Sequence, residues 1–148
     1  MSERGGRLRT ASWILVTFFT AVVALISGVS AWLAYSGADY PIAGEPVAEV
    51  AAGREGIEVG LRAIRGTSAA YALGFSILMI GIAVGPYRQG TRWSWWTLLV
   101  ANLGLWAAVA LRLPALGTSA GVGAATTQVV LIVVVLLLDA GRLRSAEG

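Results

Sequence analysis

Long uncharged stretches of the chain alternate with short segments that hold its charges. These stretches lie between Arg9 and Asp39, Arg65 and Arg88, Arg92 and Arg112, and Arg112 and Asp139. A hydrocarbon core about 30 Å thick needs roughly 20 apolar residues of helix to cross it, and each stretch is close to or above that length. The pattern therefore predicts four membrane-spanning helices, near residues 13–35, 68–84, 95–113 and 120–138.

Helices are the arrangement that suits these stretches. Lipid offers no partner for backbone N–H and C=O groups, so a spanning segment must satisfy them within itself, and none of the four shows the alternation of a strand. The first stretch exceeds the apolar core of a signal peptide and is expected to be a retained span. The predicted fold class is all-α, a four-transmembrane-helix bundle that forms one integral membrane domain over residues 1–148.

Residues 36–67 form the long segment outside the predicted spans. Pro46 suits the first turn of a helix, and apolar residues then recur at helical spacing: Val47, Val50, Ile57, Leu61 and Ile64. Glycines within this segment weaken a helix by roughly 1 kcal/mol each. We therefore expect a broken amphipathic helix on the outer surface, which leads through Gly66 into the second span with Thr67 or Ser68 as its N-cap.

Composition agrees with a membrane protein and excludes several chemistries. Hydrophobic residues make up 57% of the chain and charged residues 13%, against about 25% charged in an ordinary soluble domain, and the mean hydropathy is +0.74. Cysteine and histidine are both absent from the sequence. Disulfides, thiol catalysis, zinc fingers and histidine-based acid–base chemistry are therefore excluded.

The arginines predict the orientation of the chain, which contains no lysine. With four spans, the N-terminus, the loop between the second and third spans, and the C-terminus share one side. That side carries seven arginines and three acidic residues, whereas the opposite side carries four arginines and five acidic residues. Positive charge favours the cytoplasmic side, so both termini are expected in the cytoplasm and the bilayer is that of a plasma membrane. Arginines split between two faces form no nucleic-acid interface.

Polar residues fall near the middle of three predicted spans: Ser76 in the second, Asn102 in the third and Gln128 in the fourth. An unpaired amide in hydrocarbon is costly, so both amides should face protein, and we expect them to contact each other or share a water. This layer is interpreted first as structural. With Tyr71 and Trp106 as apolar walls it also suits a ligand-lining surface, and that alternative stays open.

The outer loop gathers charges that form a second candidate site. Glu55, Glu58, Arg62 and Arg65 lie close together in the sequence, and Arg112 lies at the outer end of the third span. The arginines suit an anionic ligand at the outer mouth of the bundle. The alternative is a solvated loop whose arginines neutralise its own carboxylates, since Glu58 and Arg62 form an i,i+4 pair in the favourable order.

Small residues at four-residue spacing mark faces on which helices approach closely. The pairs Gly81–Gly85 and Gly117–Gly121 have GxxxG spacing, and Ala70–Gly74 is a looser version. The face expected on the fourth span consists of Gly117, Gly121, Ala124, Ala125 and Gln128. Such faces favour a homo-oligomer or a place in a larger membrane complex.

Several local features recur in a known architecture. Arg65 and Gly66 precede a glycine-rich second span, and the later motifs are Gly85-Pro86-Tyr87-Arg88 and Arg92-Trp93-Ser94-Trp95-Trp96. Over about residues 10–140 the layout resembles the small four-helix bacterial integral membrane proteins of the DoxX-like kind. The resemblance implies a first span, an outer loop with a short amphipathic helix, and three closely spaced spans. Most such proteins have no assigned activity, so no functional residue is carried over.

The sequence contains no phosphate-binding loop, nucleophile elbow or zinc-protease motif. We therefore nominate no catalytic residue, cofactor or metal ligand. The expected function is that of a structural or accessory membrane protein, or an oligomer-forming subunit. The alternative is a binder or carrier of a lipid or small apolar molecule in a cavity between the helices. A transporter needs a polar path, which these residues are placed to line: Ser76, Asn102, Thr126, Thr127 and Gln128.

Overall fold

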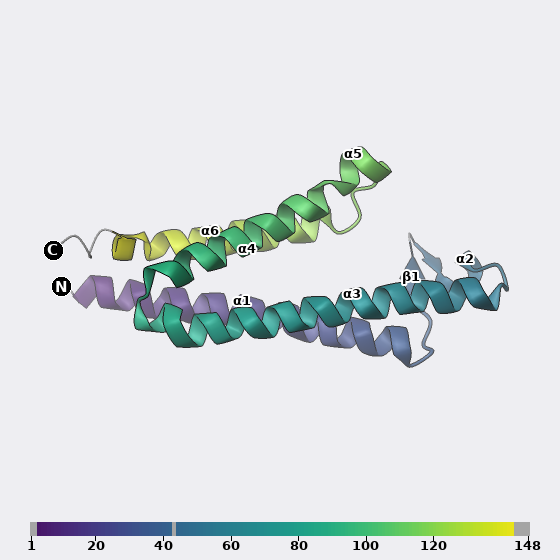
Figure 1. The fold of residues 1–148 in the computed structure, drawn as a ribbon, viewed down its shortest axis with the longest axis horizontal. Coiled ribbons are helices and arrows are strands. Elements are labelled where there is room, and N and C mark those ends of the chain that lie inside the picture. Colours follow the sequence, from purple (N-terminus) through teal and green to yellow (C-terminus); the bar gives the residue numbers. More distant parts are fainter. Residues whose placement is uncertain (1–2, 43, 144–148) are drawn as a thin grey trace. The chain divides into compact units, whose positions relative to one another are not determined.

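The computed structural model describes residues 3–42 and 44–143, and most of that range is helical (Figure 1). The long helices are α1 Glu3–Tyr35, α3 Glu55–Ile82, α4 Arg92–Ala110 and α6 Val122–Leu138. The shorter elements are strands β1 Pro41–Ile42 and β2 Glu45–Pro46, helices α2 Val47–Val50 and α5 Arg112–Leu116, the π-helical turn η1 Ala83–Tyr87 and the 3-10 turn η2 Ala140–Leu143. The predicted all-α class is confirmed, with one small hairpin added.

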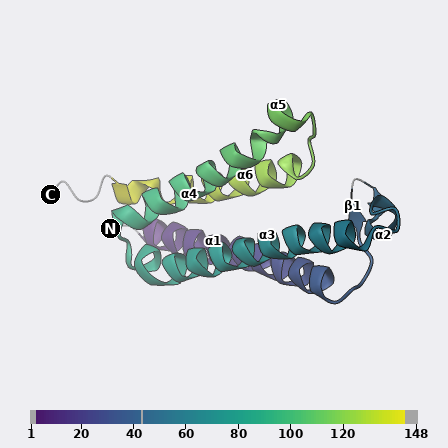
Figure 2. The same cartoon turned by 45° about the vertical axis from the view of Figure 1, so that its right-hand side comes forward.

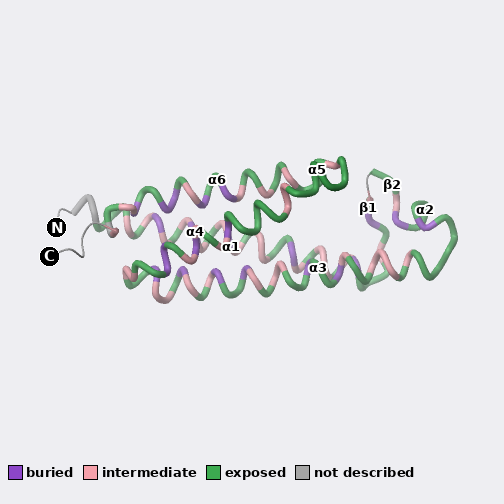
Figure 3. The backbone as a smooth tube through the Cα atoms, turned by 45° about the horizontal axis from the view of Figure 1, so that its top comes forward, coloured by how far each residue is buried: buried purple, intermediate pink, exposed green. Residues whose placement is uncertain are grey.

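Three of the described helical segments are long and apolar enough to cross a membrane: Gly6–Tyr35, Glu55–Tyr87 and Arg92–Leu116. The apolar helix Val122–Leu138 is shorter, with 17 residues. Exposed residues occur along all of the long helices (Figure 3) and include large apolar side chains such as Leu25, which is 72% exposed. Apolar exposure along whole helices is typical of a protein that lies in a membrane.

The chain forms two compact units. The terminal unit combines the chain up to Thr20 with the chain from Met79 onward, and the central unit is Ala21–Leu78. Helices α1 and α3 each begin in one unit and end in the other, so both helices contribute side chains to both units.

In the terminal unit, α4 and α6 run side by side in opposite directions (Figures 1 and 2). Leu98 on α4 and Ile132 on α6 are among the fully buried side chains of this unit. The indole Nε1 of the buried Trp95 donates to the carbonyl of Leu136 at 3.0 Å. A buried indole N–H needs an acceptor, so this bond sets the position of α4 along α6.

Helix α3 continues into η1, where the helical path is interrupted. Pro86 has no N–H to donate and its ring collides with the preceding turn, which is a common cause of a kink. Gly85 leaves helical geometry, with φ −87° and ψ −106°. The carbonyl of Pro86 accepts from both the N–H and the hydroxyl of Thr91, at 3.1 Å and 3.0 Å, and these bonds close the turn before α4.

In the central unit, the later part of α1 lies beside the first part of α3 (Figures 1 and 2). The two helices approach closely at Gly66, where an added Cβ would overlap the ring of Tyr35. Strands β1 and β2 pair antiparallel with Pro41 opposite Pro46, and α2 follows directly. Glycine at position 66 therefore makes room for an aromatic side chain from the other helix.

The predicted helix start at Thr67 or Ser68 is wrong. Helix α3 begins at Glu55 and continues without a break, so residues 55–67 of the predicted loop 36–67 are helical. Thr67 and Ser68 lie inside this helix rather than at an N-cap. The cost of glycine in a helix, about 1 kcal/mol, does not break α3 because its first turns are held by contacts with the loop, described below.

The glycine pair Gly117 and Gly121 does not form the helix face predicted for it. Gly117 follows α5 with φ +65° and Gly121 precedes α6 with φ +78°, a left-handed conformation that favours glycine. These residues belong to the turn between α5 and α6, so they share no helix face with Gln128. Around Gly81 and Gly85, no described atom lies within 4 Å of an added Cβ, so the close-approach face expected there stays a prediction.

Candidate functional site

Part of the predicted outer charged site gathers around the ring of Tyr40. This side chain is 3% exposed. The guanidinium carbon of Arg65 lies 4.1 Å from the centroid of the ring, and that of Arg62 lies 5.5 Å from it. Cation–π contacts contribute about 0.5–1 kcal/mol at exposed sites and more when desolvated. Two successive turns of α3 are thereby attached to the loop segment that carries Tyr40.

Arg62 and Arg65 are held by further partners. Arg62 Nη2 and Nε lie 2.8 Å and 2.9 Å from Oε1 of Glu58, and Arg62 Nη1 donates to the carbonyl of Ala38 at 2.7 Å. Arg65 Nε donates to Ser30 Oγ at 3.2 Å. Charge-assisted bonds of this kind are stronger than neutral ones. The predicted pair of Glu58 and Arg62 is therefore confirmed, and it neutralises one arginine of the predicted charged site.

Asp39 organises the loop end of this cluster. Its Oδ1 accepts from the backbone N–H of Tyr40 at 3.0 Å and from that of Val47 at 3.1 Å. The N–H of Val47 also donates to the carbonyl of Tyr40 at 3.0 Å. These bonds fold the hairpin back over Tyr40 and fix the ring against the arginines. We call Asp39, Tyr40, Glu58, Arg62 and Arg65 the Tyr40 cluster.

The other two predicted members of the charged site have different surroundings. Glu55 is exposed in the first turn of α3, where a carboxylate suits the positive end of the helix dipole. Arg112 belongs to the terminal unit, and its Nη1 donates to the carbonyl of Ala120 at 3.3 Å. The structure thus brings together Glu58, Arg62 and Arg65, around a tyrosine that sequence reasoning had not selected.

The predicted contact between the amides of Asn102 and Gln128 is confirmed. Gln128 Nε2 donates to Asn102 Oδ1 at 3.2 Å, and Asn102 Nδ2 donates to the carbonyl of Leu98 at 2.8 Å. Asn102 is buried, so both ends of its amide have partners where water is excluded. Each amide satisfies part of the other's hydrogen-bonding capacity, which is the structural role expected of such residues in apolar surroundings.

The remaining residues predicted for the polar layer do not share this contact. Ser76 and Tyr71 belong to the central unit. Ser76 is buried, and its Oγ has no hydrogen-bond partner among the described residues, whereas Tyr71 is 78% exposed. Trp106 lies in the terminal unit, where its Nε1 donates to Thr126 Oγ1 at 3.0 Å.

A hollow on the exposed surface of α3 was not predicted as a site. It is lined by Ala70, Tyr71, Gly74, Phe75, Ile77 and Leu78. An added Cβ at Gly74 would meet nothing within 4 Å, so the centre of the hollow is open. The small-residue spacing Ala70–Gly74 was the sequence signal for it. Tyr71 and Leu78 are large exposed side chains that line this hollow.

Sequence reasoning also missed a polar node in the terminal unit. Ser12 Oγ lies 2.5 Å from Tyr87 Oη and donates to the carbonyl of Val135 at 2.9 Å. Ser12, Val16 and Thr20 are all buried, and their four-residue spacing along α1 could have identified this face. The node brings the first part of α1, the turn before α4 and the last part of α6 to one end of the unit.

No group of three or more acidic residues is placed to hold a metal ion within residues 3–42 and 44–143. No family model, curated protein or solved structure matches this chain.

Proposed function

We propose that this chain is a multi-pass protein of a bacterial plasma membrane, a four-span bundle with both termini in the cytoplasm. We further propose that it acts as an accessory or oligomer-forming subunit, which docks another transmembrane helix against α3. The observation that carries this proposal is the open hollow at Ala70 and Gly74, flanked by exposed Tyr71 and Leu78. Small residues let helix backbones approach closely in lipid, where packing rather than the hydrophobic effect drives association.

The polar node supports the proposed topology. In a four-span arrangement the N-terminus, the turn before α4 and the C-terminus lie on one side of the membrane. Ser12, Tyr87 and Val135 join these three segments, and Arg92 Nη2 donates to the carbonyl of Leu143 at 2.7 Å. The arginines near this end favour the cytoplasmic side.

The alternative function, a carrier with a cavity between helices, finds less support. The Asn102–Gln128 bond occupies the level at which polar groups would line such a cavity. Leu98 and Ile132, each one helical turn from an amide, are fully buried. Nε2 of Gln128 and both polar atoms of the Asn102 amide are therefore engaged by the protein itself.

Membrane placement is tested first. We expect the chain to stay in the membrane fraction after carbonate extraction. Because the sequence lacks cysteine, single-cysteine variants give an unambiguous topology. In intact cells, a membrane-impermeant maleimide should label Ala48→Cys in the outer loop and should leave Gln89→Cys in the turn before α4 unlabelled. Extraction into the supernatant, or labelling with the opposite preference, contradicts the proposed topology.

Association through α3 is tested by a matched pair of glycine variants. Native mass spectrometry from mild detergent should show the chain with a second copy or a specific protein partner. Gly74→Leu fills the hollow and should lower the association constant by about tenfold, because overpacking costs about 1–3 kcal/mol. Gly81→Leu adds the same side chain at another exposed position of α3, outside the hollow, and should have little effect.

Two results would overturn this proposal. A strictly monomeric wild-type chain with no co-purifying protein excludes an oligomer-forming or accessory subunit. Equal loss of association in Gly74→Leu and Gly81→Leu removes the assignment of the α3 hollow as the docking surface.

A further inference from the structure

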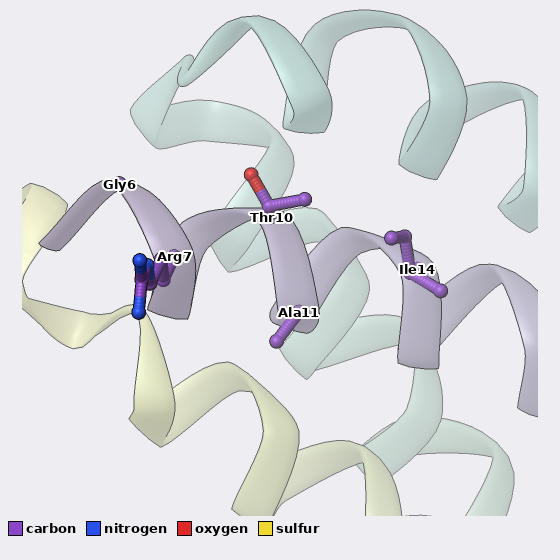
Figure 4. A pocket seen from close by; sticks show the side chains of 5 residues that line it. All are labelled: Gly6, Arg7, Thr10, Ala11 and Ile14. Atoms are coloured by element: carbon purple, nitrogen blue, oxygen red, sulfur yellow. The ribbon is translucent and has the colours of Figure 1, made fainter. Parts of the chain in front are cut away.

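The first turns of α1 carry a hollow that the proposed function does not use. It is lined by Gly6, Arg7, Thr10, Ala11 and Ile14, all in the terminal unit (Figure 4). Residues four apart share a helix face, so Thr10 and Ile14 follow one another along one edge, and Arg7 and Ala11 along the other. An added Cβ at Gly6 would meet nothing within 4 Å, so the hollow is open beside Arg7.

Arg7 differs from the neighbouring arginines because no described residue holds it. Arg9 Nη2 donates to the carbonyl of Arg88 at 3.0 Å, and the guanidinium of Arg88 lies 5.0 Å from the ring centroid of Trp13. Arg92 donates to a backbone carbonyl of η2 at 2.7 Å. Among the described residues, Arg7 forms no hydrogen bond or ion pair, and its side chain is exposed. Its charge is therefore available to a ligand.

The hollow changes from polar to apolar along the helix. Arg7 and Thr10 supply a guanidinium and a hydroxyl, and both groups donate hydrogen bonds to phosphate oxygens. Ala11 and Ile14 supply apolar surface one turn further along α1. A free phosphate would leave this apolar half in contact with water, and an acidic peptide would cover it with polar backbone. A phospholipid satisfies both halves.

We propose that this hollow binds one anionic phospholipid, with its headgroup phosphate on Arg7 and Thr10 and an acyl chain along Ala11 and Ile14. The inference rests on the proposed membrane function, because the ligand is a lipid of the leaflet that faces this end of the unit. Arg9, two residues after Arg7 on α1, and Arg88, whose carbonyl accepts from Arg9, add positive charge near the site, which attracts anionic headgroups. Selection of an anionic over a zwitterionic lipid follows from the unpaired charge of Arg7.

The test is native mass spectrometry of the full chain in mild detergent, with phosphatidylglycerol or phosphatidylcholine of identical acyl chains added. The wild-type chain should retain phosphatidylglycerol in preference to phosphatidylcholine. Arg7→Ala should weaken phosphatidylglycerol binding about fivefold, the effect of one interfacial arginine. Gly6→Leu, which fills the open end without changing the charge, should weaken it as well.

Arg54→Ala is the control, because Arg54 is exposed in the outer loop of the central unit and its loss changes the net charge equally. This variant should retain wild-type preference. Equal weakening in Arg54→Ala, or retention of binding by either Arg7→Ala or Gly6→Leu, overturns the lipid site. A chain that is membrane-bound after carbonate extraction but lacks this preference defeats the lipid site alone. A chain released by carbonate defeats the proposed function and this inference together.

Discussion

Tyr87 donates a hydrogen bond to Ser12. The hydroxyl of Ser12 has one proton, which it gives to the carbonyl of Val135 at 2.9 Å, so the 2.5 Å contact with Tyr87 must use the tyrosine proton. Ser12 and Tyr87 are both fully buried. A single serine thus joins three segments that are far apart in the sequence.

We expect Ser12→Ala to be the more harmful of two substitutions at this node. It removes both hydrogen bonds and should lower the free energy of unfolding by about 1–3 kcal/mol, whereas Tyr87→Phe leaves the bond from Ser12 to Val135 in place and should cost about 1 kcal/mol. Unfolding in mixed detergent micelles can be followed through the fluorescence of the six tryptophans. Ser68→Ala, which replaces an exposed serine on α3, is the control. If Ser12→Ala is as stable as Ser68→Ala, the node contributes nothing to the free energy of unfolding.

The bond between Asn102 and Gln128 should appear as coupling in a double-mutant cycle. Interhelical hydrogen bonds in membranes average about 0.6 kcal/mol, so Asn102→Leu and Gln128→Leu should be non-additive by about that amount. The same cycle with Thr127→Val is the reference, because Thr127 donates to the carbonyl of Gly123 within its own helix. Coupling of equal size in both cycles would show that the direct contact is not its source.

Tyr40 should tolerate loss of its hydroxyl but not of its ring. Its Oη is buried without a hydrogen-bond partner in the described part of the chain, and removal of an unsatisfied group costs little. Tyr40→Phe should therefore be cleaved by trypsin at the rate of the wild type. Tyr40→Leu loses the contacts with Arg62 and Arg65. Trypsin cleavage after the exposed Arg54 is the measurement. Faster cleavage of Tyr40→Phe would reveal an ordered partner for the hydroxyl.

Glycine at position 90 should resist substitution. Its φ is +94°, and an added Cβ would collide with the guanidinium of Arg9. Gly90→Ala should lower the unfolding free energy by more than about 1 kcal/mol. The opposite sign is expected for Gly60→Ala, since that position in α3 has open space and helical geometry and alanine favours a helix by about 0.5–1 kcal/mol. Thermal unfolding of both variants and of the wild type measures the two changes in stability.

The features that follow from apolar spacing could be predicted from the sequence. Each uncharged stretch lies largely within a helix, because apolar residues without charges favour one continuous helix. The pairing of Asn102 with Gln128 followed from counting depth, because two buried amides at one level have few other partners. Glu58 and Arg62 were predictable because i,i+4 spacing alone places them together.

Features that depend on contacts distant in sequence could not be predicted. Local propensity favoured a break before Thr67, but the bonds from Arg62 to Ala38 and from Arg65 to Ser30 hold the first turns of α3. The spacing of Gly117 and Gly121 fits a helix face and a turn equally well. In the structure both glycines have a positive φ and belong to a turn. Tyr40 looked like one aromatic residue of a belt, because its arginine partners come from another element.

The position of Val135 has a consequence for how the chain matures. During synthesis Ser12 on α1 is made before α6, which carries the carbonyl that accepts its proton. A nascent polypeptide that stops after α4 can form the bond between Ser12 and Tyr87 but leaves the serine hydroxyl without its final acceptor. Closure of the node therefore requires α6, and a product truncated before Val135 lacks one of the three segments that Ser12 joins.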